Sequence, residues 1–218
     1  MATSTVEDYV KQIYLIQQEL KGSTAPMGKL SDAMRITPGT TTTMVKALAD
    51  DGLVVYEPRV GVKLTSKGKS LALAVLRRHR IAELFLVQVL GMDWSEVHDD
   101  AERLEHAISD KVLDKMDEML NRPTRDPHGD PIPAMDGRLR HPESRSLSES
   151  PEGETVTVAR ILDQSQNFLK YIRDTGMAPG SSLKILTRNA IAEYMQVRLE
   201  NGQDVSLSTR VADKIAVE

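Results

Sequence analysis

The chain has 218 residues, of which 40% are hydrophobic and 28% charged, and this composition excludes wholesale disorder and fibrous repeats. Its length exceeds one typical domain of about 100–150 residues and predicts more than one folded unit. The sequence contains no cysteine, which excludes disulfides, zinc–cysteine fingers and thiol catalysis. We expect a cytoplasmic protein without a membrane span, because no segment approaches about 18 consecutive apolar residues and the first residues form no apolar leader.

Charge is distributed unevenly along the chain, although the net charge is only −4. Residues 1–90 carry 12 basic and 8 acidic side chains, residues 91–136 carry 5 and 13, and residues 137–218 carry 11 of each. This asymmetry favours a polyanionic partner for the first part and cations for the acidic middle. Solvated helix faces give the same counts and remain the alternative interpretation.

The first seventy residues predict three helices followed by a hairpin. Apolar spacing indicates helices over residues 5–20 and 29–34, and a third helix begins at Thr37-Pro38 and ends at Asp51-Gly52. Short strands follow over 53–56 and 62–64. This order is typical of a winged helix-turn-helix, whose third helix lies in the major groove of DNA. The candidate DNA contacts are Thr37, Pro38, Gly39, Thr40, Thr43, Lys46, Arg59 and Lys63.

The rest of the chain predicts a helical middle and a small all-β unit. Helical patterns cover residues 71–90 and 94–120, and the proline-containing residues 121–151 read as an extended connection that includes a linker. From residue 155 onward short apolar runs alternate with turns. We therefore expect a mainly α protein with four segments: residues 1–72, 73–140, a linker over 141–154, and 155–218.

Carboxylates and imidazoles at helical spacing predict a metal site. One helical face carries His98, Glu102, Glu105 and His106, and His79 and Glu83 are four residues apart on the preceding helix. Clustered carboxylates repel one another unless a cation or a proton is bound among them. Oxygen and nitrogen ligands without sulfur suit Mn²⁺, Fe²⁺ or Zn²⁺, and the carboxylate-rich mixture favours Mn²⁺. A solvated polar face remains the alternative.

These residues resemble the diphtheria toxin repressor family of metal-activated repressors. The resemblance is carried by the run from His98 to His106, by Arg78-His79-Arg80 with Glu83, and by Thr65-Ser66-Lys67-Gly68 after the hairpin. It implies a winged helix-turn-helix, a helical dimerisation and metal-binding domain, and a C-terminal SH3-like β-barrel. The implied primary metal site is Asp8, Glu102, Glu105 and His106, and the implied ancillary site is His79, Glu83 and His98, joined by Asp163 and Gln166.

Three positions bear on which metal the resemblance implies. Asp8 and Glu102 stand where the iron-responsive branch has a methionine and a cysteine, which matches the manganese-responsive branch. Lys11 stands where the manganese transport regulators have a second carboxylate, and a protonated lysine cannot ligate a metal. Whether the primary site holds one metal ion or two therefore stays open.

The resemblance implies a homodimeric repressor that is not an enzyme, is activated by Mn²⁺, and binds operator DNA of metal-uptake or metal-homeostasis genes. Fe²⁺ is a possible metal, and Co²⁺, Ni²⁺, Zn²⁺ and Cd²⁺ are expected activators in vitro. The alternatives are an iron-responsive member of the family, a metal-independent winged-helix regulator, and a metallohydrolase that uses the same His and Glu residues.

Overall fold

The computed structural model describes residues 3–140 and 143–218, which form two compact units. The first unit runs to Arg78 and includes Pro133–Arg138, and the second comprises His79–Ile132 and the residues from Leu139 onward. The finer division into four segments stays a prediction, and residues 141–142 of the predicted linker lie outside the described residues. None of the described helices combines the length and apolar character needed to span a bilayer.

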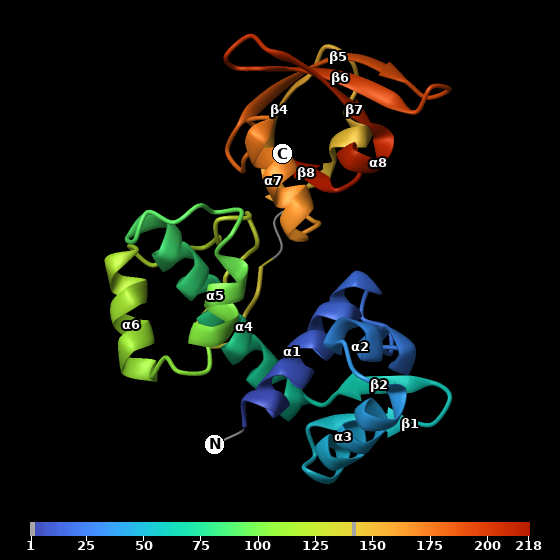
Figure 1. The fold of residues 1–218 in the computed structure, drawn as a ribbon, viewed down its shortest axis with the longest axis vertical. Coiled ribbons are helices and arrows are strands. Elements are labelled where there is room, and N and C mark those ends of the chain that lie inside the picture. Colours follow the sequence, from blue (N-terminus) through green and yellow to red (C-terminus); the bar gives the residue numbers. More distant parts are fainter. Residues whose placement is uncertain (1–2, 141–142) are drawn as a thin grey trace. The chain divides into compact units, whose positions relative to one another are not determined.

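The first unit has the predicted order of three helices and a hairpin (Figure 1). Its Thr37 caps the third helix by accepting from the backbone N–H of Thr40 at 3.3 Å, and Pro38 occupies the first turn. The buried side chains of Ile13, Leu30 and Leu48 come from three different helices. The elements are α1 (Ser4–Glu19), α2 (Met27–Met34), α3 (Pro38–Asp50), β1 (Val54–Glu57), β2 (Gly61–Leu64) and the start of α4 (Ser66–Gln88).

The helical part of the second unit differs from prediction, because the pattern over 94–120 forms two helices rather than one. They are α5 (His98–Leu104) and α6 (Asp110–Met119). The Asp93 carboxylate accepts the backbone N–H of Ser95 at 2.9 Å and its hydroxyl at 2.7 Å, which holds a turn before α5. Ser109 caps α6 by accepting from Val112 N. The apolar spacing continues through the turn before α5 and through the residues between α5 and α6. Local side-chain hydrogen bonds nevertheless determine where the two helices begin.

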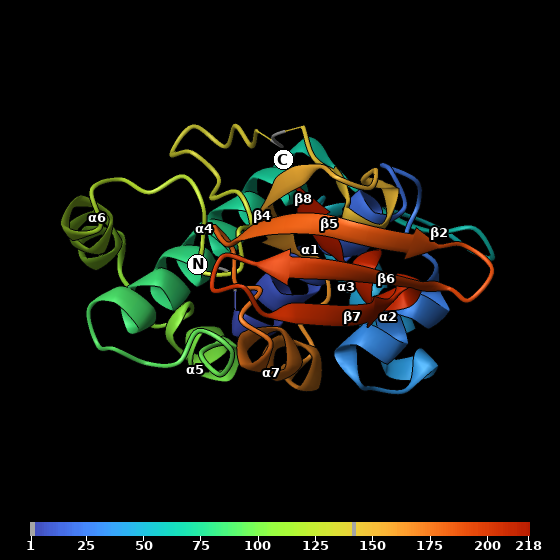
Figure 2. The same ribbon diagram turned by 90° about the horizontal axis from the view of Figure 1, so that it is seen from above.

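The remainder of the second unit is built on an antiparallel sheet (Figure 1). The sheet has six strands and surrounds an apolar core. Figure 2 shows β5, β6 and β7 side by side, in agreement with the strand order β3-β8-β4-β5-β6-β7. The elements are β3 (Arg145–Ser146), the 3-10 helix η1 (Leu147–Glu149), β4 (Thr155–Ile161), α7 (Gln166–Asp174), β5 (Ser182–Asn189), β6 (Tyr194–Leu199), β7 (Asp204–Ser208), α8 (Thr209–Ala212) and β8 (Ile215–Val217).

One prediction for the C-terminal part is wrong. The unit is not all-β, because α7 buries Leu169 and Ile172 against the sheet core. The description "mainly α" holds in part for the chain as a whole, because helices predominate up to α6 and a sheet organises the C-terminal part. A nine-residue helix with a few apolar positions gives a weak periodic signal, and packing against the sheet stabilises it.

The predicted extended connection over 121–151 is partly packed inside the second unit. Asp126 accepts the backbone N–H groups of His128 and Asp130, each at 2.9 Å, and Arg125 and Pro131 form an isolated β-bridge. His128 also accepts through its carbonyl from Ile161 N on β4. We call residues 126–132 the buried loop. Its polar residues satisfy one another's backbone groups, which allows an irregular segment to be buried.

Candidate metal centre

The three helical residues of the predicted ancillary site come together in the second unit. His79 and Glu83 face each other across one turn of α4, with Nε2 and Oε1 3.1 Å apart. His98, the first residue of α5, places Nδ1 3.2 Å from the same Glu83 oxygen. Glu83 is buried, as is His79. One donor atom from each residue lies within 4.8 Å of the others, which is compatible with a single metal ion.

Carboxylates of the predicted primary site meet the opposite nitrogen of His79. The His79 Nδ1 atom lies 2.7 Å from Glu105 Oε2 and 3.6 Å from Glu102 Oε1. His106 Nε2 lies 3.4 Å from the other Glu105 oxygen. These donors come from α5 and the turn after it, so the helical spacing that predicted them holds only as far as Leu104.

The remaining predicted primary ligand, Asp8, lies on α1 in the first unit and is half-buried. Its participation in a metal site with residues of the second unit stays a prediction. Lys11, also on α1, is 2% exposed. That this lysine contributes no ligand, and whether the primary site holds one metal ion or two, stay predictions.

The buried loop adds two donors that the sequence interpretation missed. Glu83, Asp126 and His128 form a further group of candidate ligands, and all three are buried. His128 Nε2 donates to the Trp94 carbonyl at 2.9 Å, because a carbonyl can only accept. The other nitrogen, Nδ1, lies 3.5 Å from Glu83 Oε2. The sequence Asp126-Pro-His128-Gly-Asp130 could have indicated these ligands, because it places two carboxylates and an imidazole within five residues of the proline-containing connection.

The electrostatics of this group fit a cation. Although burial alone would raise it, the charge and hydrogen bonds of the surrounding histidines hold the pKa of Glu83 well below its usual range. Burial, with the charges of Asp130 and Glu83, raises the pKa of Asp126 to about 7. Burial opposes protonation of His128, but Glu83 and Asp126 outweigh it and raise the pKa of His128 to about 9. The group thus retains protons that a divalent ion can replace.

Two buried polar atoms support the same fit. Asp126 Oδ2 and His128 Nδ1 make no hydrogen bond of normal length to any of the described residues. Asp126 Oδ2 has Arg80 Nε at 3.4 Å as an ion-pair neighbour, and Arg80 also donates to the Pro131 carbonyl. Buried polar groups are usually hydrogen-bonded, so incompletely satisfied donors and acceptors among carboxylates suit a ligand. The residues present therefore fit a divalent metal.

The predicted contributions from the C-terminal part are placed differently. Asp163 accepts from Lys214 Nζ at 2.6 Å and from Ser165 N at 2.9 Å. Gln166 is exposed at the start of α7. Neither belongs to a group of candidate ligands within the described residues. It is Gln164 that reaches the buried loop, where its Nε2 donates to Asp130 Oδ2. The participation of Asp163 and Gln166 in metal binding stays a prediction.

The candidate DNA contacts form an exposed surface on the first unit. Arg59 adopts a left-handed conformation with φ of 67° between the hairpin strands. In the first turn of α3, Pro38 has no N–H group, Thr40 N donates to Thr37 Oγ1 and Thr41 N donates to the Thr37 carbonyl. The N–H group of Gly39 is therefore the one that this turn offers to a phosphate. All eight predicted residues are exposed, namely Thr37, Pro38, Gly39, Thr40, Thr43, Lys46, Arg59 and Lys63.

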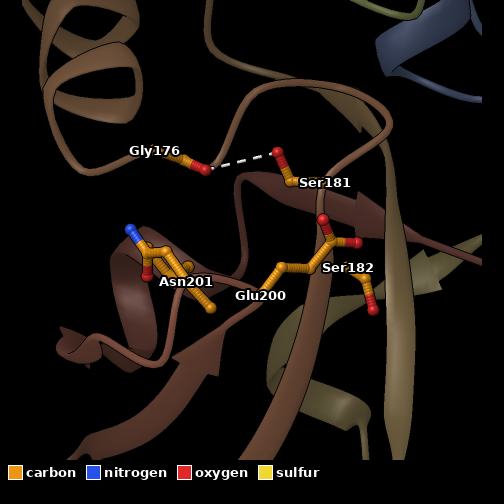
Figure 3. Close-up of a pocket in the computed structure, with 6 residues that line it drawn as sticks. Gly176, Ser181, Ser182, Glu200 and Asn201 are labelled. Carbon is orange, nitrogen blue, oxygen red and sulfur yellow. Dashed lines mark hydrogen bonds between the residues drawn. The ribbon is translucent and has the colours of Figure 1, made fainter.

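A pocket in the C-terminal part contains none of the predicted site residues (Figure 3). Ser181 Oγ donates to the Gly176 carbonyl at 3.2 Å on one side of it. The lining holds one carboxylate, that of Glu200. A single carboxylate among hydroxyl and amide groups does not make a metal site comparable with the clusters around Glu83.

Family models match three consecutive parts of the chain. Residues 1–62 match the iron-dependent repressor N-terminal DNA-binding domain, and residues 65–134 match the iron-dependent repressor metal-binding and dimerisation domain. Residues 145–218 match the FeoA domain. These matches agree with a DNA-reading first part, a metal-binding middle and a small C-terminal domain.

Comparisons with individual proteins cover nearly the whole chain. The iron-dependent repressor IdeR of Mycobacterium leprae is 30% identical, over 98% of this chain and 96% of its own. The diphtheria toxin repressor of Corynebacterium efficiens is 31% identical, with 98% and 95% coverage. A solved manganese-dependent transcriptional repressor in complex with manganese is 39% identical, with a TM-score of 0.87 and 97% and 98% coverage. The chain therefore belongs to the diphtheria toxin repressor family of metal-dependent transcriptional regulators.

Proposed function

We propose that this protein is a transcriptional repressor whose DNA binding is activated by a divalent metal, with Mn²⁺ as the physiological ion. The observation that carries the proposal is the convergence of His79, Glu83, His98, Glu105 and their neighbours on one buried region. Its donors are carboxylate oxygens and imidazole nitrogens, with no sulfur. This set favours Mn²⁺ over softer ions.

A solved relative supports manganese, and curated relatives support iron as the second candidate. A solved relative at 39% identity is described as manganese-dependent, and ScaR, at 30% identity, has been solved with bound Zn²⁺. The curated relatives at 30–31% identity are named for iron or for the diphtheria toxin. Fe²⁺ is therefore the second candidate, and we expect Co²⁺, Ni²⁺, Zn²⁺ and Cd²⁺ to activate the protein in vitro.

We propose that two copies bind operator DNA as a symmetric dimer in the cytoplasm. The matched dimerisation domain supports this assembly, and so do large apolar side chains that the second unit leaves exposed. A dimer places two reading helices on successive major grooves. The target genes are expected to serve metal uptake or homeostasis. The exposed apolar residues of the helical part are Val89, Leu90, Leu104, Val112 and Met119.

DNA binding is expected to depend on the metal. Fluorescence anisotropy of a labelled duplex, recovered from random-sequence DNA by selection with the Mn²⁺-loaded protein, measures this directly. We expect Mn²⁺ to tighten binding by about five- to 150-fold, the range of a typical allosteric coupling. Equal affinity with and without any divalent metal would support the metal-independent regulator instead. A parallel titration with Fe²⁺ ranks the two candidate ions.

Metal binding at the group of Glu83, Asp126 and His128 is expected to release protons. A bound ion needs His128 Nδ1 without its proton, and the raised pKa of His128, about 9, keeps that proton on at pH 7.5. Metal affinity at this group should therefore rise about tenfold per pH unit from pH 7 toward 9 and level off above it. Calorimetry in two buffers of different ionisation enthalpy counts the protons, and His128→Gln should remove about one per chain.

A metallohydrolase using the same residues remains the rival of a different class. It requires an open coordination position and an activated water. Assays with generic esters and phosphates in the presence of Mn²⁺ test for that activity, and we expect no turnover.

A further inference from the structure

Three consecutive threonines on α3 have already used their hydroxyl hydrogens. The Oγ1 atoms of Thr41, Thr42 and Thr43 donate to the backbone carbonyls four residues earlier, at 3.1, 2.8 and 3.1 Å. A threonine hydroxyl has one hydrogen and two lone pairs. Each of these side chains can therefore offer a partner only an acceptor oxygen and a methyl group.

Only one of the three threonine side chains is exposed enough to contact DNA. Thr41 is buried and Thr42 half-buried, whereas Thr43 is exposed. Thr43 lies between exposed Gly39, one turn before it, and Lys46, almost one turn after it. Gly39 has no side chain, so it does not cover the methyl group and oxygen of Thr43 one turn later. Because threonine is β-branched, its few rotamers fix how the two groups are presented.

An acceptor beside a methyl group matches one kind of base pair in the major groove. An A·T pair offers the N6 amino donor of adenine and the C5 methyl group of thymine. A G·C pair also offers an amino donor, N4 of cytosine, but it has no methyl group, and guanine presents two acceptors that repel the lone pairs of Thr43. The methyl group of thymine therefore carries most of the discrimination. Lys46 can pair with any backbone phosphate, so it contributes affinity without sequence preference.

We propose that Thr43 is a specificity-determining residue that selects an A·T pair in each operator half-site, through its methyl group and its acceptor oxygen. This inference rests on the proposed DNA-binding function and adds the base that the site reads. It predicts that base pairs are distinguished by one methyl contact and one acceptor oxygen, without the bidentate hydrogen bonds that arginine or asparagine make to bases.

The experiment uses the full-length Mn²⁺-loaded protein and the selected duplex. Each thymine is replaced in turn by deoxyuridine, which lacks the methyl group, and each adenine by unsubstituted purine, which lacks the amino group. At one position per half-site we expect deoxyuridine to weaken binding about fourfold, the effect of one buried methyl group. Thr43→Ser, which lacks the methyl group, should lose that sensitivity. Thr43→Val should keep it but become insensitive to loss of the adenine amino group.

Controls separate a specific loss from a general one. Thr5→Val, at an exposed position on α1, should leave both scans unchanged. Binding of random-sequence DNA at low salt should be equal for all variants, because Val and Thr have similar helix propensities and phosphate contacts remain. A selected site whose deoxyuridine scan is the same for wild type and Thr43→Ser overturns this inference alone. Failure to select any site overturns the proposed function together with it.

Discussion

Replacement of Glu105 by glutamine is expected to abolish activation of DNA binding by Mn²⁺. Glu105 is fully buried, and its two oxygens face His79 Nδ1 at 2.7 Å and His106 Nε2 at 3.4 Å. Glutamine preserves the volume but loses the charge and one acceptor oxygen, so it is a poor ligand for a hard cation. The affinity for operator DNA in saturating Mn²⁺ should fall to the metal-free value, a loss of about five- to 150-fold.

The matched control for this substitution is Glu118→Gln. Glu118 is an exposed carboxylate on α6 that pairs with Lys115 at 2.6 Å, and exposed ion pairs contribute little to stability. Glu118→Gln should keep full Mn²⁺ activation in the same anisotropy titration. Circular dichroism checks that both variants are folded. Normal activation of Glu105→Gln would exclude Glu105 from the metal site that controls DNA binding.

Replacement of Gly129 by alanine is expected to destabilise the second unit and weaken its metal site together. Gly129 has φ of +87°, and an added Cβ would lie 2.1 Å from the Ala159 carbonyl oxygen. The clash is with backbone of β4, so a side-chain rotation cannot relieve it. We expect a loss of about 2–5 kcal/mol from the clash and the left-handed conformation. Because His128 precedes Gly129, displacement of the loop should also weaken Mn²⁺ binding.

Gly153→Ala separates the clash from the backbone conformation. Gly153 has φ of +84° but open space around its Cβ position, so we expect a loss of only about 1–2 kcal/mol. Urea denaturation followed by Trp94 fluorescence reports the second unit, since Trp94 is the only tryptophan and its ring centroid lies 5.8 Å from that of His128. Equal effects of the two alanines would contradict a close approach between the buried loop and β4.

The first unit could be predicted closely because its signals are local. The Thr37 cap, Pro38 in the first helical turn and the glycine after α3 act within a few residues of one another. The predicted single helix over 94–120 was wrong for a complementary reason. Apolar spacing continued across the segment, while the hydrogen bonds of Asp93 and Ser109 that end and start helices depend on individual side chains. The helix α7 was missed because its stability comes from packing.

In the candidate site, too, local signals could be predicted from the sequence and contacts between distant segments could not. Helical spacing brought His79 next to Glu83, because residues four apart share a face. It could not show that Glu105 meets the other nitrogen of His79, or that Asp126 and His128 join Glu83 from a proline-containing connection. Those neighbours are 26 to 45 residues apart, and no local periodicity relates them.

The amino-acid sequence fixes the chemistry available to this protein: imidazole and carboxylate donors without thiols, an acidic middle, and a reading helix with small side chains. Tertiary structure decides which donors meet and which are buried. It places the buried loop against β4, and so converts Asp126 and His128 from residues of a connection into neighbours of Glu83. The physical reason is that ligand geometry and pKa values depend on through-space distance and burial, which packing between distant segments sets.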